Sequence, residues 1–143
     1  RKLELVSVWF DEKKDLAILL PKIPKNEKND FPYLKFNNVN SLTIGQPVMV
    51  IGGSVDGLWQ IINGNIIDLN QTTVNDGGIT TTNTIEHSSV ISRGFSGSPL
   101  VDENGEAIGV NIAKGFNSSF AVNLTEIKSF IEKFYKKLPE SIK

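Results

Sequence analysis

Short apolar stretches separated by turn-forming residues make up most of the chain. The first two cover residues 3–10, rich in β-branched and aromatic side chains, and residues 15–20, which end at Pro21. Stretches of this length and composition, bounded by Gly, Pro and Asn, predict β-strands. Further strands are predicted at residues 47–52, 59–69 (interrupted at Asn63-Gly64), 80–89, 98–102, 107–113 and 120–122. Residues 21–30, rich in Lys, Asn and Pro, predict a loop.

Two of these strands are predicted to form a tight hairpin. Asn104-Gly105 lies between the strands at residues 98–102 and 107–113. Both residue types adopt positive φ readily, and this dipeptide is the strongest short signal for a two-residue hairpin loop. The two strands are therefore expected to pair through a turn with positive φ at both positions.

The end of the chain has a different periodicity. Its apolar residues recur three or four positions apart, at Leu124, Ile127, Ile131, Phe134 and Leu138. This spacing places them on one face of an amphipathic helix. Asn123 is a favourable N-cap, Glu126 is placed to complete a capping box, and Pro139 stops the helix. The whole pattern predicts an all-β barrel with a C-terminal helix, residues 124–138, packed on its outside.

Composition narrows the function classes. The chain has 143 residues, about one domain, and its net charge of −1 provides no basic field for nucleic acid or anionic lipid. The absence of cysteine excludes disulfides and a cysteine nucleophile, and with a single histidine only carboxylates remain as metal ligands. No phosphate loop or dinucleotide fingerprint occurs, so no cofactor is expected. No apolar run reaches the roughly 18 residues of a membrane span. A disulfide-free chain is compatible with a bacterial periplasmic, secreted or intracellular location.

Residues 94–100, Gly-Phe-Ser-Gly-Ser-Pro-Leu, carry the clearest candidate chemistry. A nucleophilic serine needs a tight turn that exposes its hydroxyl and directs backbone N–H groups at the developing oxyanion. Gly94 lets the chain bend before Ser96, and Gly97 keeps the site uncrowded after it. The amides of Gly94 and Ser96 are then the oxyanion donors. The alternative is an ordinary Gly-Ser turn between strands.

This segment resembles the nucleophile loop of trypsin-like serine proteases, Gly-x-Ser-Gly-Gly-Pro. Ser98 replaces the second glycine, as in the staphylococcal glutamyl endopeptidase group. Residues 98–111 are similar to the hairpin that follows the nucleophile in the family. Residues 42–53 and 119–131 resemble the opening of the second barrel and the closing strand and helix of HtrA-type proteases. Residues 15–20, Asp-Leu-Ala-Ile-Leu-Leu, resemble the segment with the triad aspartate.

The resemblance implies a chymotrypsin-like fold in which Ser96 and Asp15 are catalytic. Residues 31–143 would hold an essentially complete second six-stranded barrel, and residues 1–30 a remnant of the first barrel with its linker. Asp15 would accept the Nδ1–H of the triad histidine and stabilise the imidazolium. An Asp before an apolar strand is also a common turn residue, which is the alternative for Asp15.

The triad histidine is missing from this sequence. In this family it precedes the aspartate, but none of the residues before Asp15 is histidine. The single histidine, His87, falls on the strand that leads to the nucleophile loop, where a solvated strand or loop position is expected. The upstream half would therefore be a separate or omitted segment of the same protein that carries the histidine and acts as a partner. A degenerate protease without its catalytic half is the other explanation.

The resemblance also implies a specificity pocket. Val90, six residues before the nucleophile, would line its floor, and Asn111, Ile112, Ala113 and Phe120 would belong to its walls. An apolar pocket of this kind predicts cleavage of a polypeptide after small or aliphatic residues. Two other functions stay open: a catalytically inactive module whose cleft binds extended peptide by β-augmentation, and a purely structural domain of a larger assembly.

Overall fold

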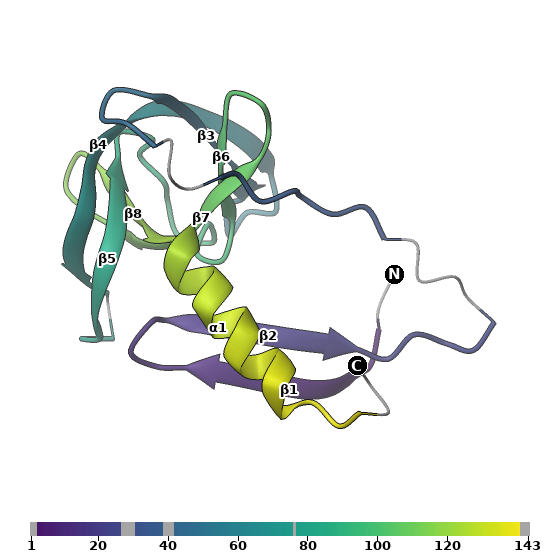
Figure 1. Ribbon diagram of the computed structural model, residues 1–143. Helices are drawn as coiled ribbons and strands as arrows, with labels where there is room; N and C mark the ends of the chain where they lie inside the picture. The colour runs from purple at the N-terminus through teal and green to yellow at the C-terminus, as the bar shows by residue number, and fades with distance from the viewer. Residues whose placement is uncertain (1–2, 27–30, 39–41, 76, 141–143) are drawn as a thin grey trace.

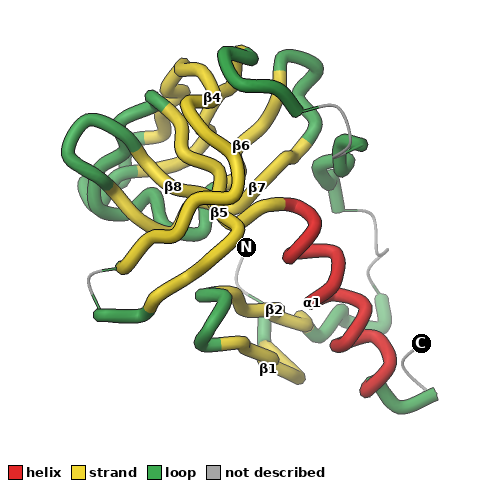
Figure 2. The backbone as a smooth tube through the Cα atoms, turned by 60° about the vertical axis from the view of Figure 1, so that its left-hand side comes forward, coloured by secondary structure: helices red, strands yellow, loops and turns green. Residues whose placement is uncertain are grey.

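The structure, a computed structural model, describes residues 3–26, 31–38, 42–75 and 77–140. Six strands form a closed barrel and two form a separate hairpin, and the C-terminal helix runs from the barrel alongside that hairpin (Figures 1 and 2). Within the described ranges, no helix is long and apolar enough to cross a membrane.

Antiparallel pairing closes the barrel. Its strands are β3 (Pro47–Gly53), β4 (Trp59–Val74), β5 (Thr80–His87), β6 (Pro99–Asp102), β7 (Ala107–Lys114) and β8 (Ser119–Asn123). They are hydrogen-bonded in the order β3-β4-β5-β8-β7-β6, and β3 pairs with β6 to complete the ring. The predicted six-stranded barrel with a terminal helix is confirmed.

The barrel interior is apolar because side chains alternate along each strand. In β3, for example, Val48 and Val50 are buried, whereas Pro47 at the start of the strand is exposed. The central core consists of Val48, Val50, Ile66, Ile85, Ile91, Phe95, Leu100, Ile108 and Ala121. Ile91 and Phe95 come from the segment between β5 and β6 rather than from a strand, and the larger of the two is Phe95. Its ring is fully buried, so this residue anchors the loop in the core.

Strand β4 is continuous, so the predicted interruption at Asn63-Gly64 is wrong. Gly64 stands opposite Val48 in the ladder between β3 and β4. A Cβ on Gly64 would lie 2.4 Å from Ser89 Oγ, so the glycine accommodates a close neighbour rather than ending the strand. The strand also continues to Val74, where its later residues pair with β5.

The turn between β6 and β7 also differs from the prediction. Gly105 has φ 73°, but Asn104 is not among the residues with positive φ in the described part of the chain. Gly105 N–H donates to Asp102 O (3.0 Å), and Asp102 Oδ1 accepts from the N–H groups of Asn104 and Glu106, both at 2.9 Å. The side chain of Asp102 therefore organises the turn, and only the glycine needs the left-handed conformation.

The hairpin consists of β1 (Leu5–Asp11) and β2 (Leu16–Pro21) and shares a second core with the helix and the barrel. That core contains Leu16, Ile112, Ala113, Val122, Leu124, Ile127 and Phe130. Trp9 of the hairpin packs against Phe134 with ring centroids 6.4 Å apart, and Lys137 Nζ lies 4.1 Å from the Trp9 ring. Two strands match the predicted remnant of a first barrel. The division at residues 30 and 31 stays a prediction, and residues 27–30 lie outside the described ranges.

Helix α1 (Leu124–Lys137) ends one residue earlier than predicted, and Leu138 is its C-cap. Its buried residues are Leu124, Ile127, Phe130 and Phe134. Ile131 was predicted to lie on the apolar face, but it is 36% exposed. The core contains its neighbour Phe130 instead.

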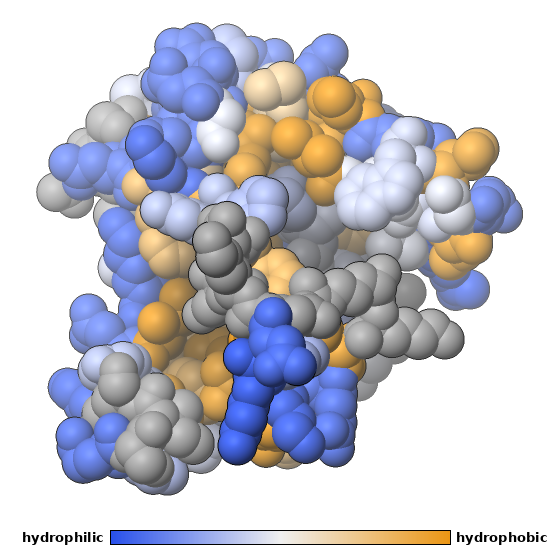
Figure 3. Space-filling view, turned by 90° about the vertical axis from the view of Figure 1, so that its right-hand side faces the viewer, coloured by the Kyte–Doolittle hydropathy of each residue, from blue (hydrophilic) through white to orange (hydrophobic). Residues whose placement is uncertain are grey.

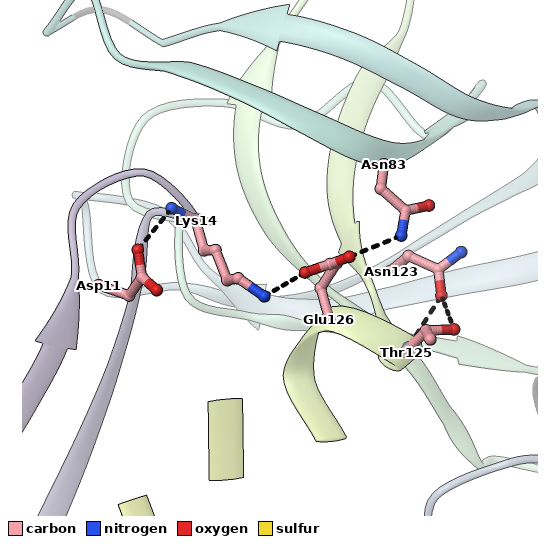
Figure 4. Close-up of polar contacts among 6 residues, drawn as sticks. All are labelled: Asp11, Lys14, Asn83, Asn123, Thr125 and Glu126. Carbon is pink, nitrogen blue, oxygen red and sulfur yellow. Dashed lines mark hydrogen bonds and ion pairs between the residues drawn. The ribbon is translucent and has the colours of Figure 1, made fainter. Parts of the chain in front are cut away.

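The start of α1 is capped, but the predicted capping box does not form. Asn123 Oδ1 accepts from the N–H of Thr125 at 3.0 Å, as an N-cap should. Glu126, however, pairs with Lys14 of the hairpin turn and accepts from Asn83 Nδ2 of β5 at 3.0 Å (Figure 4). The Lys14 ammonium, followed by the Asn83 amide, lowers the pKa of the Glu126 carboxyl. The Glu126 carboxylate thus links α1 to the hairpin turn and to β5 instead of bonding to the backbone at the start of the helix.

Candidate active site

Ser96 occupies a turn whose two glycines have conformations that other residues rarely adopt. Gly94 has φ 102° and Gly97 has φ 88°. A Cβ on Gly94 would also lie 2.6 Å from Val55 N, so a larger residue there would clash with the backbone after β3. Ser96 is exposed, whereas the neighbouring Phe95 is fully buried. The turn therefore presents the Ser96 side chain at the surface on a fixed base.

Backbone hydrogen bonds attach this turn to β7. Gly97 N–H donates to Asn111 O at 2.8 Å, and Asn111 N–H donates to Ser98 O at 2.9 Å. Within the turn, Ser98 N–H donates to Phe95 O at 2.9 Å. The residues on either side of the Ser96 hydroxyl are therefore held by contacts distant in sequence.

A hydrogen bond fixes the orientation of the peptide before Gly94. Arg93 O accepts a hydrogen bond from Val55 N–H at 3.1 Å. The C=O and N–H of a trans peptide point in opposite directions, so the Gly94 N–H is directed away from Val55. Neither this N–H nor that of Ser96 donates to another group in the described residues. Both predicted oxyanion donors are thus left available, although their role stays a prediction.

Asp15 lies in the turn between β1 and β2 with φ 52°. Its Oδ2 accepts a hydrogen bond from Asn75 Nδ2 at 2.8 Å. Asp15 and Ser96 line one cavity of about 380 Å³, together with residues of β7 and α1 such as Ile112 and Phe130. The fold thus brings the two predicted catalytic residues, far apart in sequence, to a common space.

A second cavity of about 440 Å³ also borders Ser96. Its other lining residues are Asn75, Gly77, Ile91, Ser92, Arg93, Ile112, Ala113, Lys114 and Gly115. Of the residues predicted for the specificity pocket, Ile112 and Ala113 lie here, and Asn111 lines the smaller cavity. Val90 is 45% exposed and lines neither of these cavities, and Phe120 packs against the second core.

Several lining residues were not predicted from the sequence. Ile91 and Arg93 lie between Val90 and Ser96, so a search of that whole segment would have included them. Asn75 comes from the loop between β4 and β5, and only the tertiary structure places it beside Asp15. Among the described residues, no group of three or more His, Cys, Asp or Glu could hold a metal ion.

His87 is buried, so the expectation of a solvated histidine is wrong. The side chain is fully buried, and its Nε2 lies 2.8 Å from Asn111 Oδ1. Burial lowers the pKa of His87 to about 4, outweighing the hydrogen bond to Asn111 and the charge of Glu86, which raise it. The ring is therefore neutral near pH 7. It lines neither cavity at Ser96.

Comparisons with known proteins agree with this geometry. The sequence pattern of the trypsin-like peptidase domain matches residues 1–110. A probable periplasmic serine protease do/HhoA-like of Haemophilus influenzae is 33% identical over 79% of this chain and 23% of that protein. Serine protease HTRA1A of Danio rerio is 30% identical over 90% of this chain and 26% of that protein. The chain thus spans about a quarter of the length of these curated relatives.

Two solved structures share the fold. The crystal structure of Deg5 matches 84% of this chain and 55% of that chain, with 27% identity and a TM-score of 0.66. The MamO protease domain from Magnetospirillum magneticum matches 89% of this chain and 66% of that chain, with 24% identity and a TM-score of 0.70. Both likenesses confirm the chymotrypsin-like fold. Because the family pattern covers most of the chain and the barrel has the same architecture, this chain belongs to the trypsin-like peptidase domain family, in its HtrA-type branch.

Proposed function

We propose that this chain supplies the nucleophile and the aspartate of a serine endopeptidase. The observation that carries the proposal is the shared cavity that Ser96 and Asp15 line. The curated relatives are named serine proteases and endoproteases, which supports the same reaction class. The histidine between the two groups would come from polypeptide outside these 143 residues, because the single histidine of this chain is buried in the barrel.

In the proposed reaction, Ser96 Oγ attacks the scissile carbonyl carbon while the histidine Nε2 takes the hydroxyl proton. The carbonyl electron pair moves to oxygen, where the N–H groups of Gly94 and Ser96 stabilise it. The histidine then returns the proton to the leaving amine as the C–N bond breaks. Water subsequently hydrolyses the acyl-enzyme by the same steps in reverse order.

Asp15 is arranged to hold such a histidine. Its Oδ2 accepts from Asn75, and no described residue donates to its Oδ1. The free oxygen could accept the histidine Nδ1–H while Asn75 keeps the carboxylate plane fixed. Two acceptor contacts of this kind would set the ring orientation and stabilise the imidazolium.

The hairpin offers a surface for the segment that carries the histidine. Val6, Val8 and Phe10 alternate along β1 and are 54%, 53% and 63% exposed, and Leu19, paired with Val8, is 56% exposed. Figure 3 shows apolar surface in the lower part of the molecule, where the hairpin and α1 lie. Contiguous exposed apolar side chains mark interaction sites. We therefore assign this face of the hairpin to the upstream half of the same protein.

The cavity of about 440 Å³ is the proposed site for the side chain before the scissile bond. Its apolar lining by Ile91, Ile112 and Ala113 supports cleavage after small or aliphatic residues. Arg93 and Lys114 also line it, and their positive charges disfavour a basic side chain there. Profiling with a peptide library tests this specificity. A strong preference for Arg or Lys would show that the pocket has been assigned wrongly.

Fluorophosphonate labelling of the full-length natural protein tests the reaction itself. The wild-type protein should form an adduct that mass mapping locates at Ser96, and the Ser96→Ala variant should not. No adduct in a folded sample that contains the upstream half would refute the protease. In that case peptide binding that Ser96→Ala leaves unchanged would identify a catalytically inactive binding module.

A further inference from the structure

A chain of hydrogen bonds leads from the barrel interior to the residues that follow Ser96. His87 Nε2 lies 2.8 Å from Asn111 Oδ1. Asn111 Nδ2 in turn donates to Ser98 O at 3.0 Å and to Ser98 Oγ at 3.2 Å. The backbone of Asn111 also bonds to Ser98 O and to the N–H of Gly97. His87 and Asn111 are both fully buried, so water does not compete for the contact between their side chains.

The direction of each bond in this chain follows from the groups involved. Ser98 O can only accept, so the amide nitrogen of Asn111 must face it. Asn111 Oδ1 then faces His87 and can also only accept, so His87 Nε2 must carry a proton. A neutral imidazole has one N–H, which leaves Nδ1 without one. His87 Nδ1 is indeed buried with no hydrogen-bond partner among the described residues.

An unpartnered ring nitrogen in the core is unfavourable, so the histidine is not explained by core packing alone. Its single donated bond, however, selects one of the two orientations of the Asn111 amide. If that amide rotated by half a turn, its oxygen would oppose Ser98 O, and the link to the turn would become repulsive. Because Gly94 and Gly97 give the turn little intrinsic rigidity, its shape depends on such external contacts.

We propose that His87 is a positioning residue for the nucleophile, acting through Asn111 on the Gly97–Ser98 backbone. By donating from Nε2, it keeps the Asn111 amide bonded to Ser98. That contact fixes the part of the turn that directs the Ser96 hydroxyl and N–H. This inference rests on the proposed function. It gives a buried histidine outside the triad a role in that reaction.

Three variants of the full-length natural protein test the proposal. His87→Leu removes the donor, His87→Gln retains an N–H that can reach Asn111, and Thr81→Val is the matched control. Thr81 is on the same strand and 2% exposed, and its hydroxyl has no partner among the described residues. The measurements are the rate of fluorophosphonate modification at Ser96, kcat and KM on a peptide substrate, and the melting temperature.

We expect His87→Leu to lower the modification rate and kcat by about 10- to 100-fold, as small displacements of a nucleophile do. KM should change by less than about twofold, because no residue of the 440 Å³ cavity is altered. His87→Gln should recover most of the rate, and Thr81→Val should equal the wild type. Wild-type rates in folded His87→Leu, or equal losses in the Gln and Leu variants at equal stability, would overturn the proposal.

A measurement on the wild-type protein covers the case in which His87→Leu does not fold. Long-range ¹H–¹⁵N correlations report the tautomer of His87, and the proposal requires the proton on Nε2 between pH 5 and pH 8. A proton on Nδ1 would overturn it. If wild-type Ser96 is not labelled at all, the proposed function fails instead, and the tautomer still decides whether the His87–Asn111 bond has the required direction.

Discussion

Protonation of His87 should destabilise this protein as the pH falls below neutrality. The ring is fully buried and neutral, and burial lowers the pKa of His87 to about 4 from the usual 6.5. In the unfolded chain the same side chain takes up a proton near pH 6.5. Between these two values the unfolded state binds more protons than the folded state. The free energy of unfolding must therefore decrease as the pH falls through this window.

The size of the effect follows from the two pKa values. Proton linkage with folded and unfolded values of about 4 and 6.5 predicts a loss of about 2 kcal/mol between pH 7 and pH 5. By pH 4 the loss reaches about 3 kcal/mol and then levels off, because His87 becomes protonated in the folded state as well. A loss of this size is a large share of the 5–15 kcal/mol typical of a domain.

Urea denaturation of the wild-type protein and the His87→Gln variant, from pH 7 to pH 4, isolates this contribution. Carboxylates such as Glu126, whose pKa is lowered by Lys14, titrate in both proteins and cancel in the difference. From pH 7 to pH 4, the free energy of unfolding of the wild type should therefore fall by about 3 kcal/mol more than that of His87→Gln. Parallel pH profiles would show that His87 titrates normally in the folded protein, and the reasoning from its burial would be wrong.

Three further substitutions have expected outcomes. Val55→Pro removes the N–H that donates to Arg93 O, so fluorophosphonate labelling at Ser96 should slow by about tenfold. Val55→Ala keeps this N–H and should label at nearly the wild-type rate. Equal labelling rates for the two variants would contradict a role for this bond. Phe95→Ala empties a fully buried ring position and should cost about 3–5 kcal/mol of unfolding free energy in urea titrations, against a much smaller loss for Phe95→Leu. Asn123→Ala removes the side-chain acceptor for Thr125 N–H at the start of α1. It should cost about 1 kcal/mol, seen as a lower melting temperature, and an unchanged value would exclude a capping contribution.

Local features of the fold were predictable because they depend on neighbouring residues. The strands, the helix start at Asn123 and the sharp turn at Gly94 and Gly97 follow from side-chain periodicity, capping and glycine conformation. The errors arose where a distant partner decided the outcome. Glu126 was expected to bond to its own helix end, but Lys14 and Asn83 offer it an ammonium and an amide. Gly64 was expected to break a strand, yet it accommodates Ser89.

The candidate site shows the same division. The sequence alone proposed Ser96 and Asp15 as catalytic residues, because the turn at residues 94–97 and the start of an apolar strand are short patterns that resemble a known family. It also showed that residues 1–14 contain no histidine. Only the tertiary structure brought Asn75 to Asp15, buried Phe95 next to Ser96 in the chain and enclosed His87 next to Asn111. Barrel closure decides these contacts, because it joins strands that lie far apart along the chain, and local preference carries no information about which side chains then meet.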